Sequence, residues 1–274
     1  MATLVKQIDP LLKEFLDLKA DQYESIDFVE NDPISIPHNF TLKEDIEIAG
    51  FLTATIAWGK RVSIIKNATR ILDIMDHSPH DFIINHELSD LKVCEGFVHR
   101  TFNACDLVYF FTQLKTIYLN HNGLESVMAS ESGSEGALDF IPRLHQLFFD
   151  AELKHRTQKH LSNPLKGSAS KRINMFLRWM VRDSKKGVDF GIWKSISPSQ
   201  LSIPLDVHTG NVGRSLGLLT RKQNDWKAVK EFDESLRSMN ASDPVRYDYA
   251  LFGIGVNKDL DYKELMNPSI LRIQ

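Results

Sequence analysis

The chain has 274 residues, of which 42% are hydrophobic, and a formal net charge of −3. This composition is enough for a buried core and excludes a disordered chain, and no run approaches the ~18 apolar residues of a membrane span. Two cysteines, Cys94 and Cys105, cannot form a four-cysteine zinc or iron–sulfur site. Without a recognisable secretory signal, the sequence predicts a soluble, cytoplasmic protein.

Helical spacing of apolar residues dominates the chain. It covers residues 4–18, and further helices are predicted over 41–57, 62–75, 106–119, 138–154, 171–182, 225–238 and 244–252. Thr41 and Glu44 have the spacing of a capping box, and Asn224 is a candidate N-cap. The small polar stretch 129–136 is predicted to be a loop. Because no alternating strand of six residues is found, we predict an all-α fold: one helical unit with approximate lobes 1–130 and 137–274.

Charge is distributed unevenly. Residues 154–186 contain ten lysines and arginines and a single acid, Asp183, which gives +9 and leaves −12 for the remainder. A basic region on an acidic body can attract phosphate locally. On charge alone, an ordinary solvated surface is as good an interpretation of this segment as a phosphate-binding region.

Three features between residues 164 and 217 could carry chemistry. The first is a run of small residues that permits a tight turn, namely Gly167, Ser168, Ala169 and Ser170. The helix predicted to follow it offers N–H groups for a phosphate. The second is Lys171 at the start of that helix, where the helix dipole and neighbouring cations disfavour the ammonium form, so it is a candidate nucleophile. The third is Asp206, a candidate N-cap that could stabilise a cation or accept a proton.

The helix predicted over 171–182 is amphipathic. Its core-facing stripe consists of Ile173, Phe176, Leu177, Met180 and Val181. The opposite side carries Lys171, Arg178 and Arg182. Together with Arg172, these two arginines are candidates for salt-dependent contacts to a nucleic acid.

These residues resemble the helix-hairpin-helix DNA glycosylase superfamily, and most closely an uncharacterised bacterial family within it. The superfamily hairpin reads Gly-x-Gly-x-Lys and is followed by Pro-Val-Asp-x-His; here the segments are GSASK (167–171) and PLDVH (204–208). KRINMFLRWMVR, IPLDVHTGNVGRSLGLL and DPVRYDYALFGIGV also look like that bacterial family. The resemblance is strongest over 164–256. Ala169 replaces the second glycine, and the long Lys171–Asp206 separation is similar to that of archaeal 8-oxoguanine DNA glycosylases.

The resemblance implies two helical lobes around a cleft, with 164–217 carrying the hairpin and the catalytic pair. It implies removal of damaged bases from duplex DNA, without a metal or cofactor. Lys171 would attack the sugar of a flipped nucleotide, and Asp206 would stabilise the cationic sugar or deprotonate the lysine. The Schiff base would then allow abasic-site lyase activity.

Three aromatic residues are candidates for the base pocket. Trp58, Trp179 and Tyr247 are candidate stacking partners, with Trp58 in the AWGKR segment that is expected to line the opposite wall of the cleft. Core packing is the other interpretation of each ring. Two other functions stay open: a non-catalytic binder of damaged or structured nucleic acid, and a helical protein-interaction scaffold.

Overall fold

A computed structural model describes residues 8–129, 136–149, 156–183 and 185–258, and the described chain is mostly helical. Its helices are α1 (Pro10–Tyr23), α2 (Ile26–Glu30), α3 (Lys43–Thr55), α4 (Arg61–Ile74), α5 (Pro79–Asn85), α6 (Ala104–His121), α7 (Leu124–Ala129), α8 (Ala137–Phe148), α9 (Lys171–Val181), α10 (Val207–Ser215), α11 (Trp226–Met239) and α12 (Tyr247–Asn257). Strands β1 (Val98–His99) and β2 (Phe102–Asn103) form one short antiparallel hairpin. The all-α prediction is therefore confirmed.

Short 3₁₀ turns join several helices. The turns that bear on the candidate site are η1 (Pro33–Ser35), η4 (Arg156–His160) and η5 (Pro164–Lys166). The predicted loop 129–136 and the end of the helix predicted over 138–154 lie largely outside the described residues.

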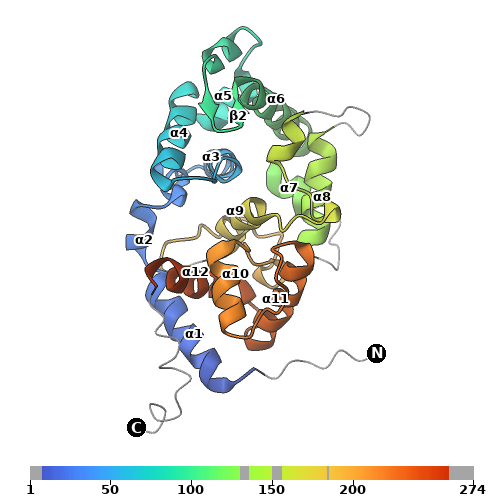
Figure 1. Cartoon of the computed structure of the whole chain (residues 1–274). Coiled ribbons are helices and arrows are strands. Elements are labelled where there is room, and N and C mark those ends of the chain that lie inside the picture. The colour runs from blue at the N-terminus through green and yellow to red at the C-terminus, as the bar shows by residue number, and fades with distance from the viewer. Residues whose placement is uncertain (1–7, 130–135, 150–155, 184, 259–274) are drawn as a thin grey trace.

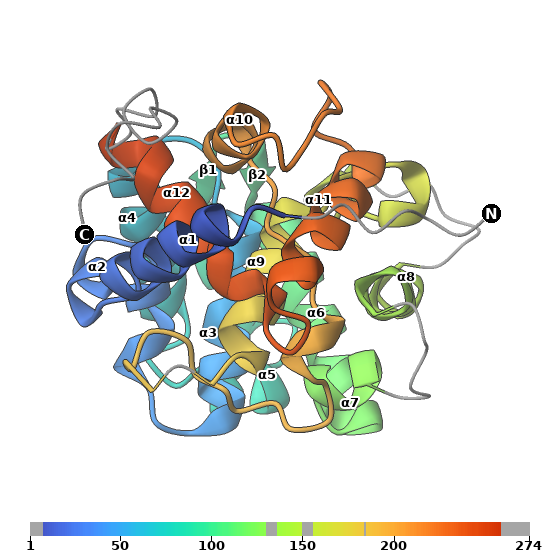
Figure 2. The same cartoon turned by 90° about the horizontal axis from the view of Figure 1, so that it is seen from below.

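The helices are arranged around α9, which lies in the middle of both views (Figures 1 and 2). In Figure 1, α3 to α6 lie above it, α7 and α8 to one side, and α10 to α12 below. Helix α1 packs along α12, so the first helix joins the C-terminal helices. The first helix of the predicted lobe 1–130 thus packs against a helix of the predicted lobe 137–274.

Two predicted helix starts are wrong by one residue. Helix α3 begins with Leu42 at its N-cap and without a side-chain cap, so the capping box predicted at Thr41 does not form. Helix α11 is capped by Asp225 rather than Asn224. The Asn224 amide instead donates to the backbone oxygen of Asp206, at 2.9 Å. Asn224, the residue before the N-cap of α11, therefore connects this helix to the start of α10.

Helix α9 is buried on all sides. Every residue from Ile173 to Val181 is buried, including those outside the predicted apolar stripe. Helix α3 packs against it closely, since a Cβ on Gly50 would lie 3.1 Å from the Met180 Cε. The hydrophobic core runs through this contact as one continuous cluster. In the part of the chain that the structure describes, none of the helices has the length and apolar character needed to cross a bilayer.

Candidate active site

The turn before α9 is held against the start of α11. Gly167 has φ +83°, a conformation that favours glycine, and its carbonyl accepts from the Trp226 N–H at 3.0 Å. Ser170 also has a positive φ, +50°, whereas Ala169 does not. Ala169 stands where the superfamily hairpin has its second glycine, and its backbone conformation in this turn does not require glycine.

The first turn of α9 can present N–H donors to an anion. Ser170 occupies its N-cap position, but the side chain makes no capping hydrogen bond. The Ser170 hydroxyl instead donates to the Ser168 carbonyl at 3.3 Å, and the Ser170 N–H donates to the Ser168 Oγ at 3.1 Å. Because the first N–H groups of a helix have no intrahelical acceptor, this helix start suits a phosphate.

The two predicted catalytic residues stand where the sequence placed them along the chain. Lys171 is the first residue of α9 and is half-buried, and its Nζ lies 3.3 Å from the Met175 Sδ. Asp206 is the half-buried N-cap of α10, and its Oδ1 accepts from the Thr209 N–H at 2.9 Å. The predicted capping role of Asp206 is therefore confirmed.

A buried carboxylate, Asp248 in the first turn of α12, connects the surroundings of both residues. Its Oδ2 accepts from Arg178 and its Oδ1 from the Thr209 hydroxyl, at 3.5 Å. Burial raises the pKa of Asp248 to about 6; Arg178 opposes this shift, Asp206 adds to it and Lys171 opposes it. Lys171 and Asp206 thus lie within electrostatic range of one carboxylate. Sequence reasoning missed Asp248, although it lies in the DPVRYDYALFGIGV segment.

A second buried carboxylate, Asp32, lies within electrostatic range of Lys171 and comes from the N-terminal part of the chain. Asp32 is the N-cap of η1, and its Oδ1 accepts from the Ile34 N–H at 3.1 Å. Burial raises the pKa of Asp32, and the charges of Arg61, Arg178 and Lys171 act against that shift. Sequence reasoning missed this residue too, because its only signal is an Asp-Pro pair that suits any turn.

Arg178 and Arg182 are not available to DNA, which corrects the prediction that they contact it. They are only 5% and 6% exposed. Their guanidinium groups pair with four acids from other parts of the chain: Glu24, Asp189, Asp243 and Asp248. These ion pairs hold α9 to the end of α1 and to the start of α12. A polar helix face that looks solvated in sequence is therefore an internal ion-pair network.

The AWGKR segment after α3 faces the start of α9. The Arg172 guanidinium lies 4.7 Å from the centre of the half-buried Trp58 ring and donates to the Thr55 carbonyl. The Trp58 ring also stacks on His160, with centroids 5.7 Å apart. Burial lowers the pKa of Arg172 to about 10 and that of His160 to about 4. At neutral pH this cluster therefore combines a cation, an aromatic ring and a neutral imidazole.

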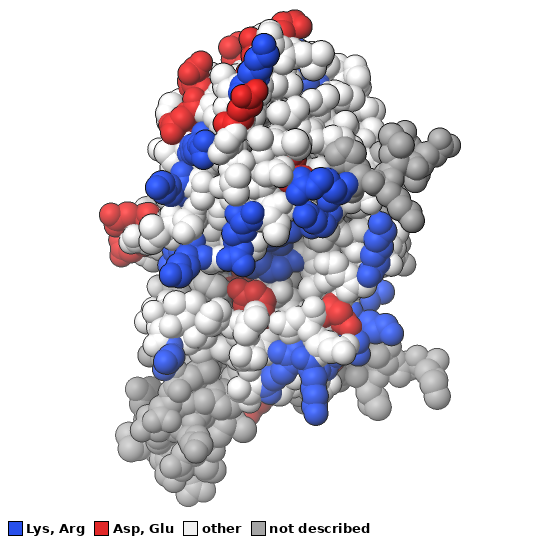
Figure 3. Space-filling model, turned by 45° about the horizontal axis from the view of Figure 1, so that its top comes forward, with Lys and Arg blue, Asp and Glu red and all other residues white. Residues whose placement is uncertain are grey.

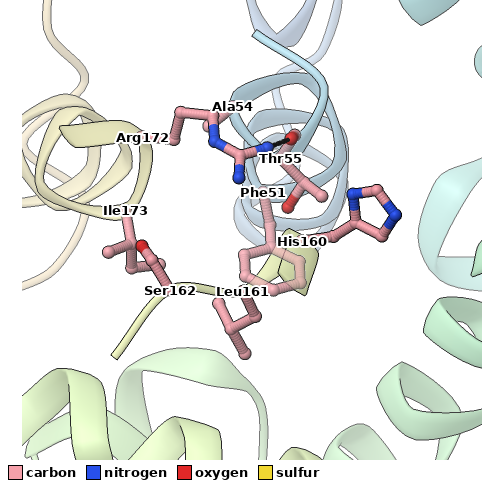
Figure 4. A pocket seen from close by; sticks show the side chains of 8 residues that line it. All are labelled: Phe51, Ala54, Thr55, His160, Leu161, Ser162, Arg172 and Ile173. Carbon is pink, nitrogen blue, oxygen red and sulfur yellow. Dashed lines mark hydrogen bonds between the residues drawn. The ribbon is translucent and has the colours of Figure 1, made fainter. Parts of the chain in front are cut away.

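A small pocket opens beside Arg172 (Figure 4). Residues of α3, of the end of η4 and the segment after it, and of α9 line it: Phe51, Ala54, Thr55, His160, Leu161, Ser162, Arg172 and Ile173. Its free volume of about 10 Å³ is room for one water. A nucleobase could enter here only if the walls moved.

Two of the three predicted stacking residues belong to the core. Trp179 and Tyr247 are both 0% exposed, and the Tyr247 hydroxyl donates to Asp17 at 2.9 Å. Neither ring can therefore meet a base, which corrects that prediction and confirms the core-packing interpretation. Trp58 is the one of the three that reaches the surface.

Exposed cations lie on the segments around Trp58. They are Lys60 and Arg61 after it, Arg100 in the β-hairpin, and Arg156 and Lys159 on η4. Figure 3 shows lysines and arginines gathered in a band across the middle of one face, with several acids toward its upper edge. Three of these five cations precede residue 154, so the basic segment 154–186 is not the only source of exposed positive charge. Lys154 lies outside the described residues.

Comparisons with known proteins give one match. A family model described as a protein of unknown function, DUF2400, matches residues 32–257. No curated protein and no solved structure matches the chain. The family description contains no reference to helix-hairpin-helix proteins, so the glycosylase resemblance stays a prediction.

Proposed function

Because the chain belongs to the DUF2400 family, whose function is unknown, we propose a function from the site itself: a DNA base-excision glycosylase with abasic-site lyase activity. The observation that supports the proposal is that Lys171 begins α9 and Asp206 caps α10, two helices that Asp248 joins through its hydrogen bonds to Arg178 and Thr209. An amine at the start of one helix and a carboxylate at the start of another are the pair that such chemistry needs.

The surroundings of this pair suit a nucleic acid. The uncapped start of α9 offers N–H donors to one backbone phosphate. Exposed cations such as Arg61, Arg100 and Lys159 add affinity that depends on salt and not on sequence. In the proposed complex a damaged nucleotide rotates out of the duplex, and Trp58 is the candidate aromatic surface for it.

The proposed chemistry begins with neutral Lys171. Its Nζ bonds to the sugar C1′, while the bond from C1′ to the base breaks and its electron pair leaves with the base, which takes up a proton. Asp206 stabilises the positive charge that develops on the sugar. Opening of the sugar ring and loss of a proton from Nζ give an iminium. Removal of a proton from C2′ then expels the 3′ phosphate and cuts the strand.

Borohydride trapping tests this proposal. The wild type is incubated with duplexes that carry an oxidised base or a preformed abasic site, and the reduced covalent adduct is counted on a denaturing gel. We expect an adduct with the wild type and none with Lys171→Gln. Lys166→Gln, an exposed lysine in the same turn, is the matched control and should give the wild-type yield.

Asp206→Asn separates the two proposed roles. Asparagine is also a good N-cap, so α10 should be preserved. We expect base excision to fall by about 10²–10³-fold, because a preorganised stabilising charge is lost, while trapping on a preformed abasic site is retained. Equal trapping by wild type and Lys171→Gln would refute the proposal. Salt-dependent binding of abasic DNA without any adduct would favour the non-catalytic binder.

A further inference from the structure

We infer that Asp248 is a positioning residue for Lys171 and Asp206, because its hydrogen bonds tie the start of α10 to the face of α9 that bears the lysine. The catalytic meaning of this link rests on the proposed function. The link itself consists of the contacts of Asp248 with α9 and α10 and can be tested without any substrate.

On the α10 side, Asp248 acts through one threonine. Thr209 is fully buried; its N–H donates to the Asp206 carboxylate, and its hydroxyl donates to the Asp248 carboxylate. The two helices cross closely, since a Cβ on Gly255 would lie 2.9 Å from the His208 Cβ. Asp248 therefore lies on a helix that is packed tightly against α10. Thr209, which is bonded to both carboxylates, connects the position of Asp206 to that of Asp248.

On the α9 side, Asp248 acts through Arg178. The Arg178 Nη1 donates to Asp248, its Nε donates to Asp189 at 3.3 Å, and its guanidinium lies 4.3 Å from the Tyr249 ring centre. Arg178 follows Lys171 by seven residues, which is about two helical turns, so both project from the same side of α9. A guanidinium fixed on three sides thus orients the helix that carries the lysine.

The other charges around Lys171 do not make this connection. Asp32 also lies within electrostatic range, but its described hydrogen bond is to the Ile34 N–H in its own turn. Arg61 and Arg178 act on Asp32 together with Lys171, and Asp206 is half-exposed. Among the carboxylates described around Lys171, Asp248 is the one that bonds to both α9 and α10.

The test uses Asp248→Asn in the full chain. Asparagine keeps the size and an acceptor, but it removes the negative charge. The first readout is the rate at which acetic anhydride acetylates Lys171, relative to Lys166, measured by mass spectrometry on the folded protein at fixed pH. We expect this ratio to rise about twofold or more, because the half-buried Lys171 becomes more accessible when Arg178 loses one of its anchors and the start of α9 opens more often.

The second readout is borohydride trapping on abasic DNA. We expect the maximal trapping rate of Asp248→Asn to fall about tenfold or more, with an unchanged Kd for the duplex, since a buried residue makes no DNA contact. Thr209→Val should share the fall in rate, and Thr209→Ser, which keeps the hydroxyl, should restore it. Asp233→Asn removes another buried carboxylate, in α11, and is the matched control that should change neither readout.

The outcomes separate the inference from the proposed function. An unchanged acetylation ratio, or unchanged trapping in folded Asp248→Asn and Thr209→Val, would overturn the positioning role. If the wild type itself forms no adduct, the proposed function is wrong, and the acetylation ratio still decides whether Asp248 is linked to Lys171. Thermal melting of each variant verifies that the fold is intact.

Discussion

Replacing Arg182 with methionine should destabilise the protein severely without acting through DNA. The Arg182 guanidinium bonds to Glu24, Asp189 and Asp243, and its own side chain is 7% exposed. Methionine keeps much of the apolar stem but leaves these acids without that cation. The sequence alone had placed Arg182 on a DNA-binding face, so this variant distinguishes the two interpretations.

The size of the effect follows from burial. The Asp189 side chain is fully buried and that of Glu24 is 5% exposed, so neither carboxylate can regain full hydration. Removing one partner of a buried ion pair costs about 3–5 kcal/mol. Asp189 keeps its contact with Arg178, which argues against adding the three contacts separately. For a chain of this length the loss corresponds to a fall in Tm of about 5–9 °C.

Urea unfolding followed by circular dichroism measures this loss. Lys186→Met is the matched control, because Lys186 joins the same two regions through Asp21, with side chains 39% and 59% exposed. An exposed pair of this kind contributes about 0–1 kcal/mol. The penalty of Arg182→Met should shrink from pH 8 to pH 5, since protonation relieves acids whose folded-state pKa has risen after loss of the cation.

The result that would refute this reasoning is a loss below 1 kcal/mol for Arg182→Met, close to that of Lys186→Met. A folded Arg182→Met with weakened DNA binding and normal stability would restore the surface interpretation of this residue.

Three further predictions concern other parts of the molecule. Iodide should quench Trp58 in preference to the other three tryptophans, which are buried, and an abasic duplex should protect it; a quenching constant unchanged by Trp58→Phe would contradict its exposure. Burial raises the pKa of Asp233 from 3.8 to about 6, so the folded state binds more protons and the contribution of Asp233 to stability should fall as the pH rises from 4 to 6. Asp233→Asn, which keeps an acceptor for the Ile203 N–H, should remove this contribution in urea unfolding at stepped pH, while Asp248, whose pKa is raised in the same way, keeps its own. In thermal melts, Ala169→Gly should lower the free energy of unfolding by about 0.5–1 kcal/mol and Ser170→Gly should raise it by a similar amount, because of these two residues only Ser170 has a positive φ. The reverse order would contradict this description of the turn.

Local features were predictable from the sequence because they depend on residues within a turn of one another. Helix α4 was predicted over 62–75 and spans Arg61–Ile74. Asp206 caps α10 as its sequence position suggested, and Lys171 begins α9. Helix periodicity and N-caps are set by neighbours up to four residues away, so a single sequence contains them.

The environment of each side chain could not be predicted in this way. Arg178 and Trp179 lie in α9 with Lys171, and Arg182 is the C-cap of that helix. The spacing in the sequence predicted that both arginines lie on the same solvated side as the lysine. Their burial depends on acids supplied by the end of α1, by the segment after α9 and by the start of α12. Such partners are set by packing between distant segments and leave no periodic signal.

The sequence by itself determined that this protein is helical and that an amine and a carboxylate stand at two helix starts. Only the tertiary structure bonded Asp248 to both α9 and α10 and turned two of the predicted DNA contacts into a buried ion-pair network. The physical reason is that capping is satisfied within one helical turn, whereas buried charges are neutralised by whichever segments the fold packs around them.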